Sequence, residues 1–158
     1  MTAAPGSARL SGLKANPSTE PMMTKSTPTT DAPVPTVIVS RPGIMQQSLR
    51  ASMVACRGIN VVATSGDGLT ALRQVAKLRP ELLVIDSNLL DEEVEALIAS
   101  VKVEQPTIDC LVVVRSSRQE TRMLALGADA AVLRDVSPQQ FQTELARLVS
   151  RRSSTDLK

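Results

Sequence analysis

The stretch Leu82–Leu83–Val84–Ile85–Asp86 constrains the fold more than any other part of the sequence. Four consecutive apolar residues before a carboxylate are typical of a short strand that is buried on both faces, as in a parallel sheet. Open α/β sheets place their ligands and their chemistry at the carboxyl ends of such strands. The sequence therefore predicts a parallel sheet with Asp86 at its functional edge.

Short apolar runs and segments of helical periodicity alternate along residues 34–150. The clearest helix signal is Val94, Leu97, Ile98 and Val101, at spacings i, i+3, i+4 and i+7. We expect strands at 34–39, 59–63, 82–86, 110–114 and 130–133, and helices at 44–56, 69–78, from Asp91 to just before Pro106, 118–126 and 138–150. Links this short make the crossovers right-handed and the sheet parallel, so a doubly wound α/β fold with five strands is predicted.

Local signals place several helix ends. Asp91 is the expected N-cap of the third helix, and Asp67 lies in a turn before the second. Ser137 with Gln140 forms the pattern of a capping box, and Gly127 is suited to end the fourth helix. Asp67 and Asp91 are therefore interpreted as turn and cap residues rather than as metal ligands.

Composition excludes several function classes. The chain has no His, Trp or Tyr and one Phe, so it lacks histidine chemistry and the aromatic platforms on which nucleic acid bases stack. A net charge of +2 gives no reason to expect nucleic acid binding. No apolar run approaches the ~20 residues that span a membrane. The two cysteines have no metal-binding spacing and are expected to be reduced thiols of a cytoplasmic protein.

The chain divides by composition into three parts. Residues 1–33 are rich in Pro, Ser and Thr and have no apolar period, so a disordered N-terminal tail is predicted there. Residues 34–150 carry all the expected strands and helices. Residues 151–158 are expected to form a polar C-terminal tail, and no DNA-binding domain is expected beyond them.

Several motifs together resemble the receiver domain of response regulators, the CheY-like fold. They are Ser65–Gly66–Asp67–Gly68 with Ala71 and Leu72, the run 78–86, Leu126–Gly127–Ala128 and the run 135–140. The resemblance covers residues 34–150 and implies the flavodoxin-like strand order 2-1-3-4-5. It also implies a phosphoryl acceptor at Asp86, two Mg²⁺-binding acids after the first strand, a Thr or Ser after the fourth and a Lys after the fifth.

The sequence departs from this pattern at every position except the acceptor. The acid pair falls on Ser40 and Arg41, the Thr or Ser position on Arg115 with Ser116 beside it, and the Lys position on Arg134. Mg²⁺ is held through carboxylates, so no metal or other cofactor is expected. An ion pair between Asp86 and one or more of Arg41, Arg115 and Arg134 is expected instead. Such a crevice either satisfies a buried acid or binds an anion or a partner's acidic residue.

The leading hypothesis is therefore a pseudo-receiver: a non-enzymatic, phosphorylation-independent module of two-component signalling that works by binding protein. By the resemblance, partners or a second copy would use the face of the fourth helix, fifth strand and fifth helix, which carries Arg118, Arg122 and Gln139. One alternative is an active single-domain response regulator that a histidine kinase phosphorylates on Asp86. Another is a sensor that holds an anion or a nucleotide in an arginine-lined crevice. Nucleic acid and membrane partners are not expected.

Overall fold

A computed structural model of the chain describes residues 32–86 and 88–156. The chain divides into two units, Met1–Ala32 and Pro33–Lys158, and nearly all described residues belong to the second. The predicted disordered tail, residues 1–33, lies outside the described residues except for Ala32 and Pro33, which are both exposed.

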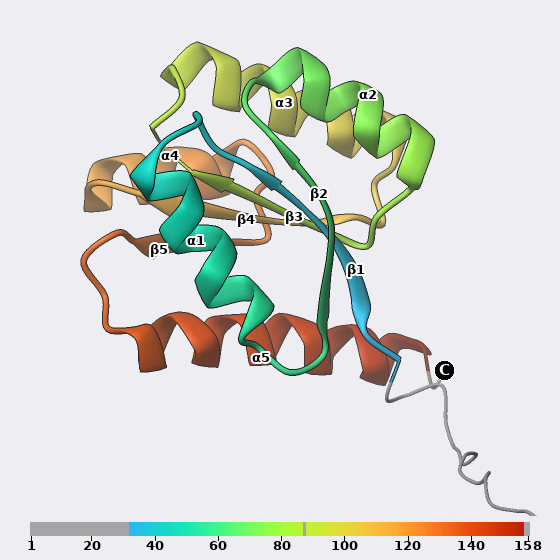
Figure 1. Cartoon of the computed structure of the whole chain (residues 1–158). Coiled ribbons are helices and arrows are strands. Elements are labelled where there is room, and N and C mark those ends of the chain that lie inside the picture. Colours follow the sequence, from blue (N-terminus) through green and yellow to red (C-terminus); the bar gives the residue numbers. More distant parts are fainter. Residues whose placement is uncertain (1–31, 87, 157–158) are drawn as a thin grey trace, which may run out of the picture. The chain divides into compact units, whose positions relative to one another are not determined.

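A five-stranded parallel sheet forms the centre of the second unit (Figure 1). Its strands are β1 (Val34–Val39), β2 (Ile59–Ser65), β3 (Leu82–Asp86), β4 (Asp109–Val114) and β5 (Ala130–Leu133). The order across the sheet is β2-β1-β3-β4-β5, and all neighbouring strands are parallel. The predicted doubly wound fold and its strand order are confirmed. The first strand, β3 and β5 have the predicted bounds.

Five helices connect and follow the strands and cover both faces of the sheet (Figure 1). They are α1 (Ile44–Val54), α2 (Gly68–Leu78), α3 (Asp91–Glu104), α4 (Ser117–Ala125) and α5 (Pro138–Asp156). Helices α2, α3 and α4 pack on one face, and α1 and α5 pack on the other. Within the described part of the chain, no helix has the length and apolar character needed to cross a bilayer.

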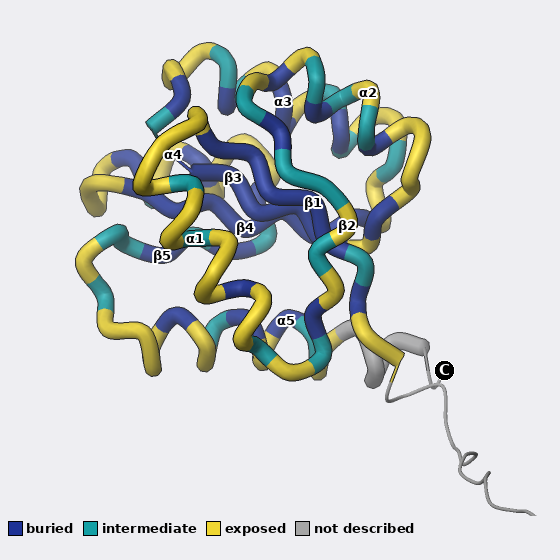
Figure 2. Tube along the Cα trace, viewed as in Figure 1, coloured by how far each residue is buried: buried dark blue, intermediate teal, exposed yellow. Residues whose placement is uncertain are grey.

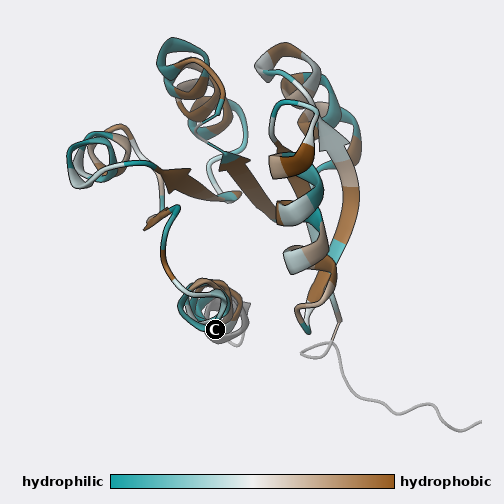
Figure 3. Cartoon of the chain, turned by 60° about the vertical axis from the view of Figure 1, so that its left-hand side comes forward, coloured by the Kyte–Doolittle hydropathy of each residue, from teal (hydrophilic) through white to brown (hydrophobic). Residues whose placement is uncertain are grey.

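Alternate residues of the central strands enter two separate hydrophobic cores. Leu83 and Ile85 of β3 pack with α2, α3 and α4, whereas Leu82 and Val84 pack with α1 and α5. All five residues of β3 are buried, as Figure 2 shows for the whole centre of the sheet. Figure 3 shows the same strands as the most hydrophobic part of the fold. This two-sided burial is the physical reason for the uninterrupted apolar run before Asp86.

Helix α1 is covered much less completely than the other elements. Met53 is its only buried residue, and Leu49 is half-buried. Ile44 at its amino end is 78% exposed and Met45 is 42% exposed. In Figure 2 most of α1 has the colour of exposed residues. Helix α1 therefore contributes only Met53 to the fully buried core on its face of the sheet.

Two expectations about helix ends need correction. Leu90, not Asp91, is the N-cap of α3; it makes no side-chain capping bond, and Asp91 is the first helical residue. The Asp91 side chain instead accepts a hydrogen bond from the Gln119 side chain of α4 at 2.9 Å. Helix α5 also continues beyond Ser150 to Asp156. Arg151 supports this extension through ion pairs to Asp109 at 3.0 Å and Asp129 at 3.6 Å.

The capping box at the start of α5 is present and allows a direct test. The Gln140 amide donates to the Ser137 hydroxyl, and the Ser137 amide donates to the Gln140 side chain, both at 3.2 Å. Ser137→Ala is therefore expected to lower the free energy of unfolding by about 1 kcal/mol, because it leaves an amide at the helix end without its partner. Urea denaturation followed by circular dichroism measures this change.

The matched control for the cap is Ser150→Ala, which changes an exposed serine in the interior of the same helix. Alanine favours helix there, so the control should not lose stability. Equal losses in Ser137→Ala and Ser150→Ala would contradict the capping role of Ser137.

Candidate functional site

Asp86 lies where the sequence predicts it, at the carboxyl end of β3 in the middle of the sheet. It is only 2% exposed. A buried carboxylate is stable only where hydrogen-bond donors and positive charge replace the lost water. The identity of its partners therefore decides what this position can do.

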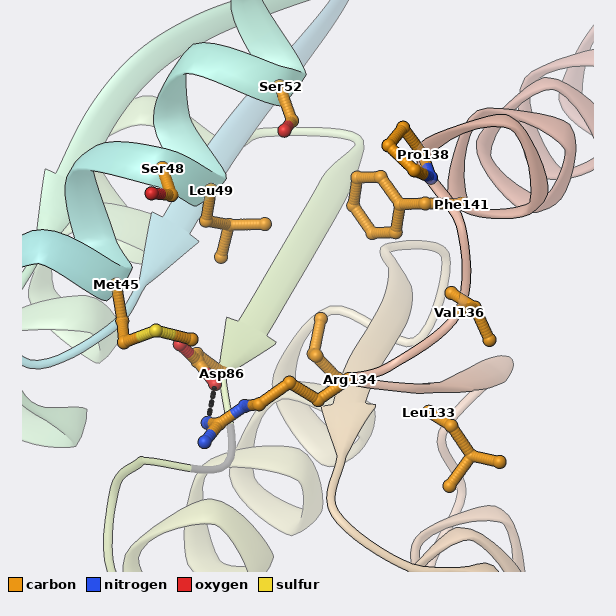
Figure 4. A pocket seen from close by; sticks show the side chains of 11 residues that line it. Met45, Ser48, Leu49, Ser52, Asp86, Leu133, Arg134, Val136, Pro138 and Phe141 are labelled. Atoms are coloured by element: carbon orange, nitrogen blue, oxygen red, sulfur yellow. Dashed lines mark hydrogen bonds and ion pairs between the residues drawn. The ribbon is translucent and has the colours of Figure 1, made fainter.

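Three groups hold the Asp86 carboxylate. The Arg134 guanidinium, after β5, contacts Oδ1 at 2.6 Å (Figure 4). The Ser40 hydroxyl, after β1, donates to Oδ2 at 3.2 Å, and the backbone amide of Asn88 donates to Oδ1 at 3.3 Å. An ion pair thus joins Asp86 to Arg134, one of the three arginines for which the sequence allowed such a pair.

Asn88 links this cluster to the chain after β1. Its side-chain amide donates to the Ser40 hydroxyl at 3.1 Å, and its Oδ1 accepts from the backbone amide of Arg41 at 3.2 Å. Gln46 of α1 donates to the Ser40 carbonyl at 2.6 Å. Ser40 is completely buried, so its hydroxyl belongs to the interior of the network rather than to its surface.

Arg41 and Arg115 contact other acids, both on α3. Arg41 pairs with Glu93 at 3.5 Å, and the other Glu93 oxygen accepts from the amide of Gly68 at 2.6 Å. Arg115 pairs with Asp91 at 3.6 Å. Each of the three arginines predicted to line the crevice therefore has a carboxylate close to it.

Ser116 serves the local structure of α4. Its hydroxyl accepts from the amide of Gln119, and the Gln119 side chain in turn accepts from the backbone amide of Arg115 at 2.8 Å. The Gln119 side-chain amide also donates to Asp91 at 2.9 Å. The structure thus brings Ser40, Asp86 and Arg134 together and places Ser116 at a helix cap.

The residues predicted for a partner face lie at the surface. Arg118 and Gln139 are exposed. Arg122 pairs with Glu95 of α3 at 2.5 Å and 3.1 Å. This hydrogen bond lowers the pKa of Glu95 and raises the pKa of Arg122. Of the two arginines on this face, Arg122 is thus held against α3.

Comparison with known proteins rests on structure alone. No family model matches the sequence, and no curated protein matches it. The signal receiver domain of the response regulator NarL from Mycobacterium tuberculosis superposes with a TM-score of 0.67 at 16% identity, over 75% of this chain and 98% of that one. The isolated REC domain of RcsB from Salmonella enterica serovar Typhimurium, in the presence of BeF3-, gives 0.65 at 21% identity, over 73% and 88%. A CheY-like receiver domain protein from Methanospirillum hungatei JF-1 gives 0.67 at 17% identity, over 78% and 99%.

The chain has the receiver-domain fold. Within this receiver fold, β1 is followed by Ser40 and Arg41, and β5 is followed by Arg134. Among residues 32–86 and 88–156, no three His, Cys, Asp or Glu side chains are grouped so that they could hold a metal ion. The residues that sequence reasoning missed are Asn88, Glu93 and Gln119, which complete the hydrogen bonds and ion pairs of the site.

Proposed function

We propose that this receiver fold is a pseudo-receiver: a non-enzymatic module of two-component signalling that binds protein partners without being phosphorylated on Asp86. The observation that carries the proposal is the state of the Asp86 carboxylate. It is 2% exposed, and both of its oxygens are engaged, by Arg134 and Asn88 on one side and by Ser40 on the other. The carboxylate that would have to accept a phosphoryl group is thus already in contact with the Arg134 guanidinium.

The chemistry of phosphoryl transfer supports this proposal. Mg²⁺ binds through one or two carboxylates and neutralises the charge of the transferring group. Here Ser40 and Arg41 follow β1, so the two residues after that strand supply no carboxylate. A guanidinium about 4 Å from a divalent cation opposes its binding by several kcal/mol at an effective dielectric of about 20.

The experiment is treatment of the whole chain with acetyl phosphate, and separately with beryllofluoride, each with Mg²⁺. We expect neither a gain of one phosphoryl group in the intact mass nor a change in the amide spectrum. A response-regulator receiver domain of known activity, treated in parallel, verifies the reagents.

The alternative, an active single-domain response regulator, gives the opposite result. A Mg²⁺-dependent gain of one phosphoryl group that disappears in Asp86→Asn would overturn the pseudo-receiver proposal. The asparagine variant is needed because acetyl phosphate also modifies other nucleophiles, and only loss of the signal assigns it to Asp86.

The face of α4, β5 and α5 remains the proposed surface for a protein partner or a second copy. Arg118 and Gln139 are exposed there, whereas Arg122 is paired with Glu95. A nucleotide sensor has less support, because Arg41, Arg115 and Arg134 each lie beside a carboxylate. A nucleotide, which carries several negative charges, would therefore have to share each of these arginines with a carboxylate of the chain.

A further inference from the structure

A pocket of about 180 Å³ lies between α1 and α5, beside the Asp86–Arg134 pair (Figure 4). Met45 and Leu49 of α1 form one wall, and Pro138 and Phe141 of α5 form the opposite wall. Figure 4 shows Leu49 and Phe141 pointing toward each other across the space. This pocket exists because α1 contributes only Met53 to the buried core on its side of the sheet.

The walls of the pocket are mainly apolar, although they are in contact with water. Phe141, the single aromatic residue of the chain, is placed here, together with Val113, Leu133 and Val136. Apolar surface that lines a concave site gains free energy when a ligand displaces the water. The body of a suitable ligand is therefore apolar.

The charged residues at one end of the pocket favour one sign of ligand charge. Among the described residues that line the pocket, Asp86 and Arg134 are the only charged ones. The Asp86 side chain is 3% exposed, whereas the Arg134 side chain is 32% exposed. The carboxylate is also bonded to Ser40 and Asn88 on its protein side. Arg134 is thus the more accessible member of the pair, and an anionic group of the ligand is favoured over a cationic one.

The size of the pocket limits the ligand further. An engineered cavity of about 150 Å³ in another protein takes up benzene, so a space of this size holds one ring and few additional atoms. We propose that the pocket binds a small monocarboxylic acid with an aromatic or branched aliphatic body. The carboxylate bonds to Arg134, and the body lies between Leu49 and Phe141. This inference goes beyond the proposed function and does not depend on it, because ligand binding is measured without phosphoryl donors or protein partners.

The experiment is a titration of the whole chain, followed by amide NMR, with three probes of one shape: phenylacetate, phenylacetamide and benzylamine. Phenylacetate is expected to saturate with a Kd of about 1 mM or tighter, as ordinary for a ligand of this size. It is expected to bind at least about 10-fold more tightly than phenylacetamide, because only the anion gains the guanidinium. Benzylamine is expected not to bind. The shifts should centre on Leu49, Arg134 and Phe141.

Two variants test the location and the role of charge. Ser52 is an exposed α1 residue that lines the pocket. The larger side chain in Ser52→Phe is expected to fill the pocket and abolish binding. Its control is Ser150→Phe, which places the same ring on an exposed site of α5 outside the pocket and should bind normally. The double variant Asp86→Asn, Arg134→Gln keeps the apolar walls and should bind phenylacetate and phenylacetamide equally.

The outcomes that overturn the proposal are distinct. They are absence of saturation by phenylacetate up to about 10 mM, equal affinity of the wild-type chain for phenylacetate and phenylacetamide, or unchanged binding in Ser52→Phe. The first two need no variant, so the test stands even if a substitution prevents folding. A phosphoryl group on Asp86 would overturn the pseudo-receiver proposal and leave the ligand titration unaffected, so the two failures are distinguishable.

Discussion

Replacing Arg134 by glutamine is expected to lower the free energy of unfolding by about 3 kcal/mol, which is the low end of the cost of breaking a buried ion pair. The Asp86 carboxylate would keep Ser40 and Asn88 as hydrogen-bond partners but would lose its guanidinium while remaining almost completely buried. Urea denaturation followed by far-UV circular dichroism measures the change, since the chain has no Trp or Tyr to report by fluorescence.

Removing the other member of the ion pair, the Asp86 carboxylate, should lower the free energy of unfolding by less. Asp86→Asn leaves the Arg134 side chain without its carboxylate, but that side chain is 32% exposed and gains water. The asparagine side chain can still accept from Ser40. We expect a loss of about 1 kcal/mol, the size of an ordinary hydrogen bond. The double variant should lose less than the sum of the two single losses, because neither charge is then left alone.

The control for charge removal is Arg122→Gln. Arg122 also pairs with a carboxylate, Glu95, but at the exposed surface, where water screens the pair. Its effect on stability should be much smaller than that of Arg134→Gln. Equal losses in Arg122→Gln and Arg134→Gln would show that the Asp86–Arg134 ion pair is not the source of the stability lost in Arg134→Gln. Strictly additive losses in the double variant Asp86→Asn, Arg134→Gln would show the same.

The strands of this fold were the easiest elements to predict. The residues Leu82–Ile85 of β3 are buried on both faces of the sheet, so all four side chains are apolar. Helix ends were harder, because they depend on distant partners. Asp91 looks like an N-cap in the sequence, but its carboxylate bonds to Gln119, which is 28 residues away. Likewise, α5 continues to Asp156 where the sequence is polar, with Arg151 paired to Asp109 and Asp129.

The contacts of the candidate site between residues that follow neighbouring strands could be predicted from the sequence. The contacts that depend on how the helices pack could not. Ser40, Asp86 and Arg134 follow neighbouring parallel strands, so their proximity follows from the strand order. Glu93 reaches Arg41 only because α3 packs beside α2. No pattern of single residues indicates such a contact.

The pocket between α1 and α5 could not be predicted for a related reason. Periodicity shows that α1 has an apolar side, with Leu49 and Met53 four residues apart. It does not show how close that side lies to α5. In the structure Met53 is fully buried whereas Leu49 lines the pocket. Which of the two side chains is buried in the core depends on the packing of the folded chain and is not indicated by the periodicity.

The second large expected effect is a decrease in the free energy of unfolding at alkaline pH, caused by Cys110. Its side chain is completely buried in β4, and this burial raises the pKa of the thiol from 9.0 to about 12. Nearby Asp129 and Asp109 also raise this pKa, while Lys102 lowers it. The unfolded chain therefore releases this proton at lower pH than the folded chain does. The contribution of the buried thiol is complete below pH 9.0 and is lost as the pH rises toward about 12.

The loss is expected to be about 1.4 kcal/mol for each pH unit in this window, and about 4 kcal/mol across it. The measurement compares the free energy of unfolding of the wild-type chain with that of Cys110→Ala, both in a Cys56→Ser background so that one thiol titrates. At neutral pH the alanine variant should be less stable, by about 1–2 kcal/mol, because it loses buried sulfur surface. As the pH rises, the difference between the two free energies of unfolding should decrease to zero and then change sign. Only the protein with Cys110 is destabilised by the ionisation of this thiol in the unfolded chain. Other groups that titrate in the same range affect both proteins alike, so parallel pH profiles would rule out the thiol as the source of the alkaline loss.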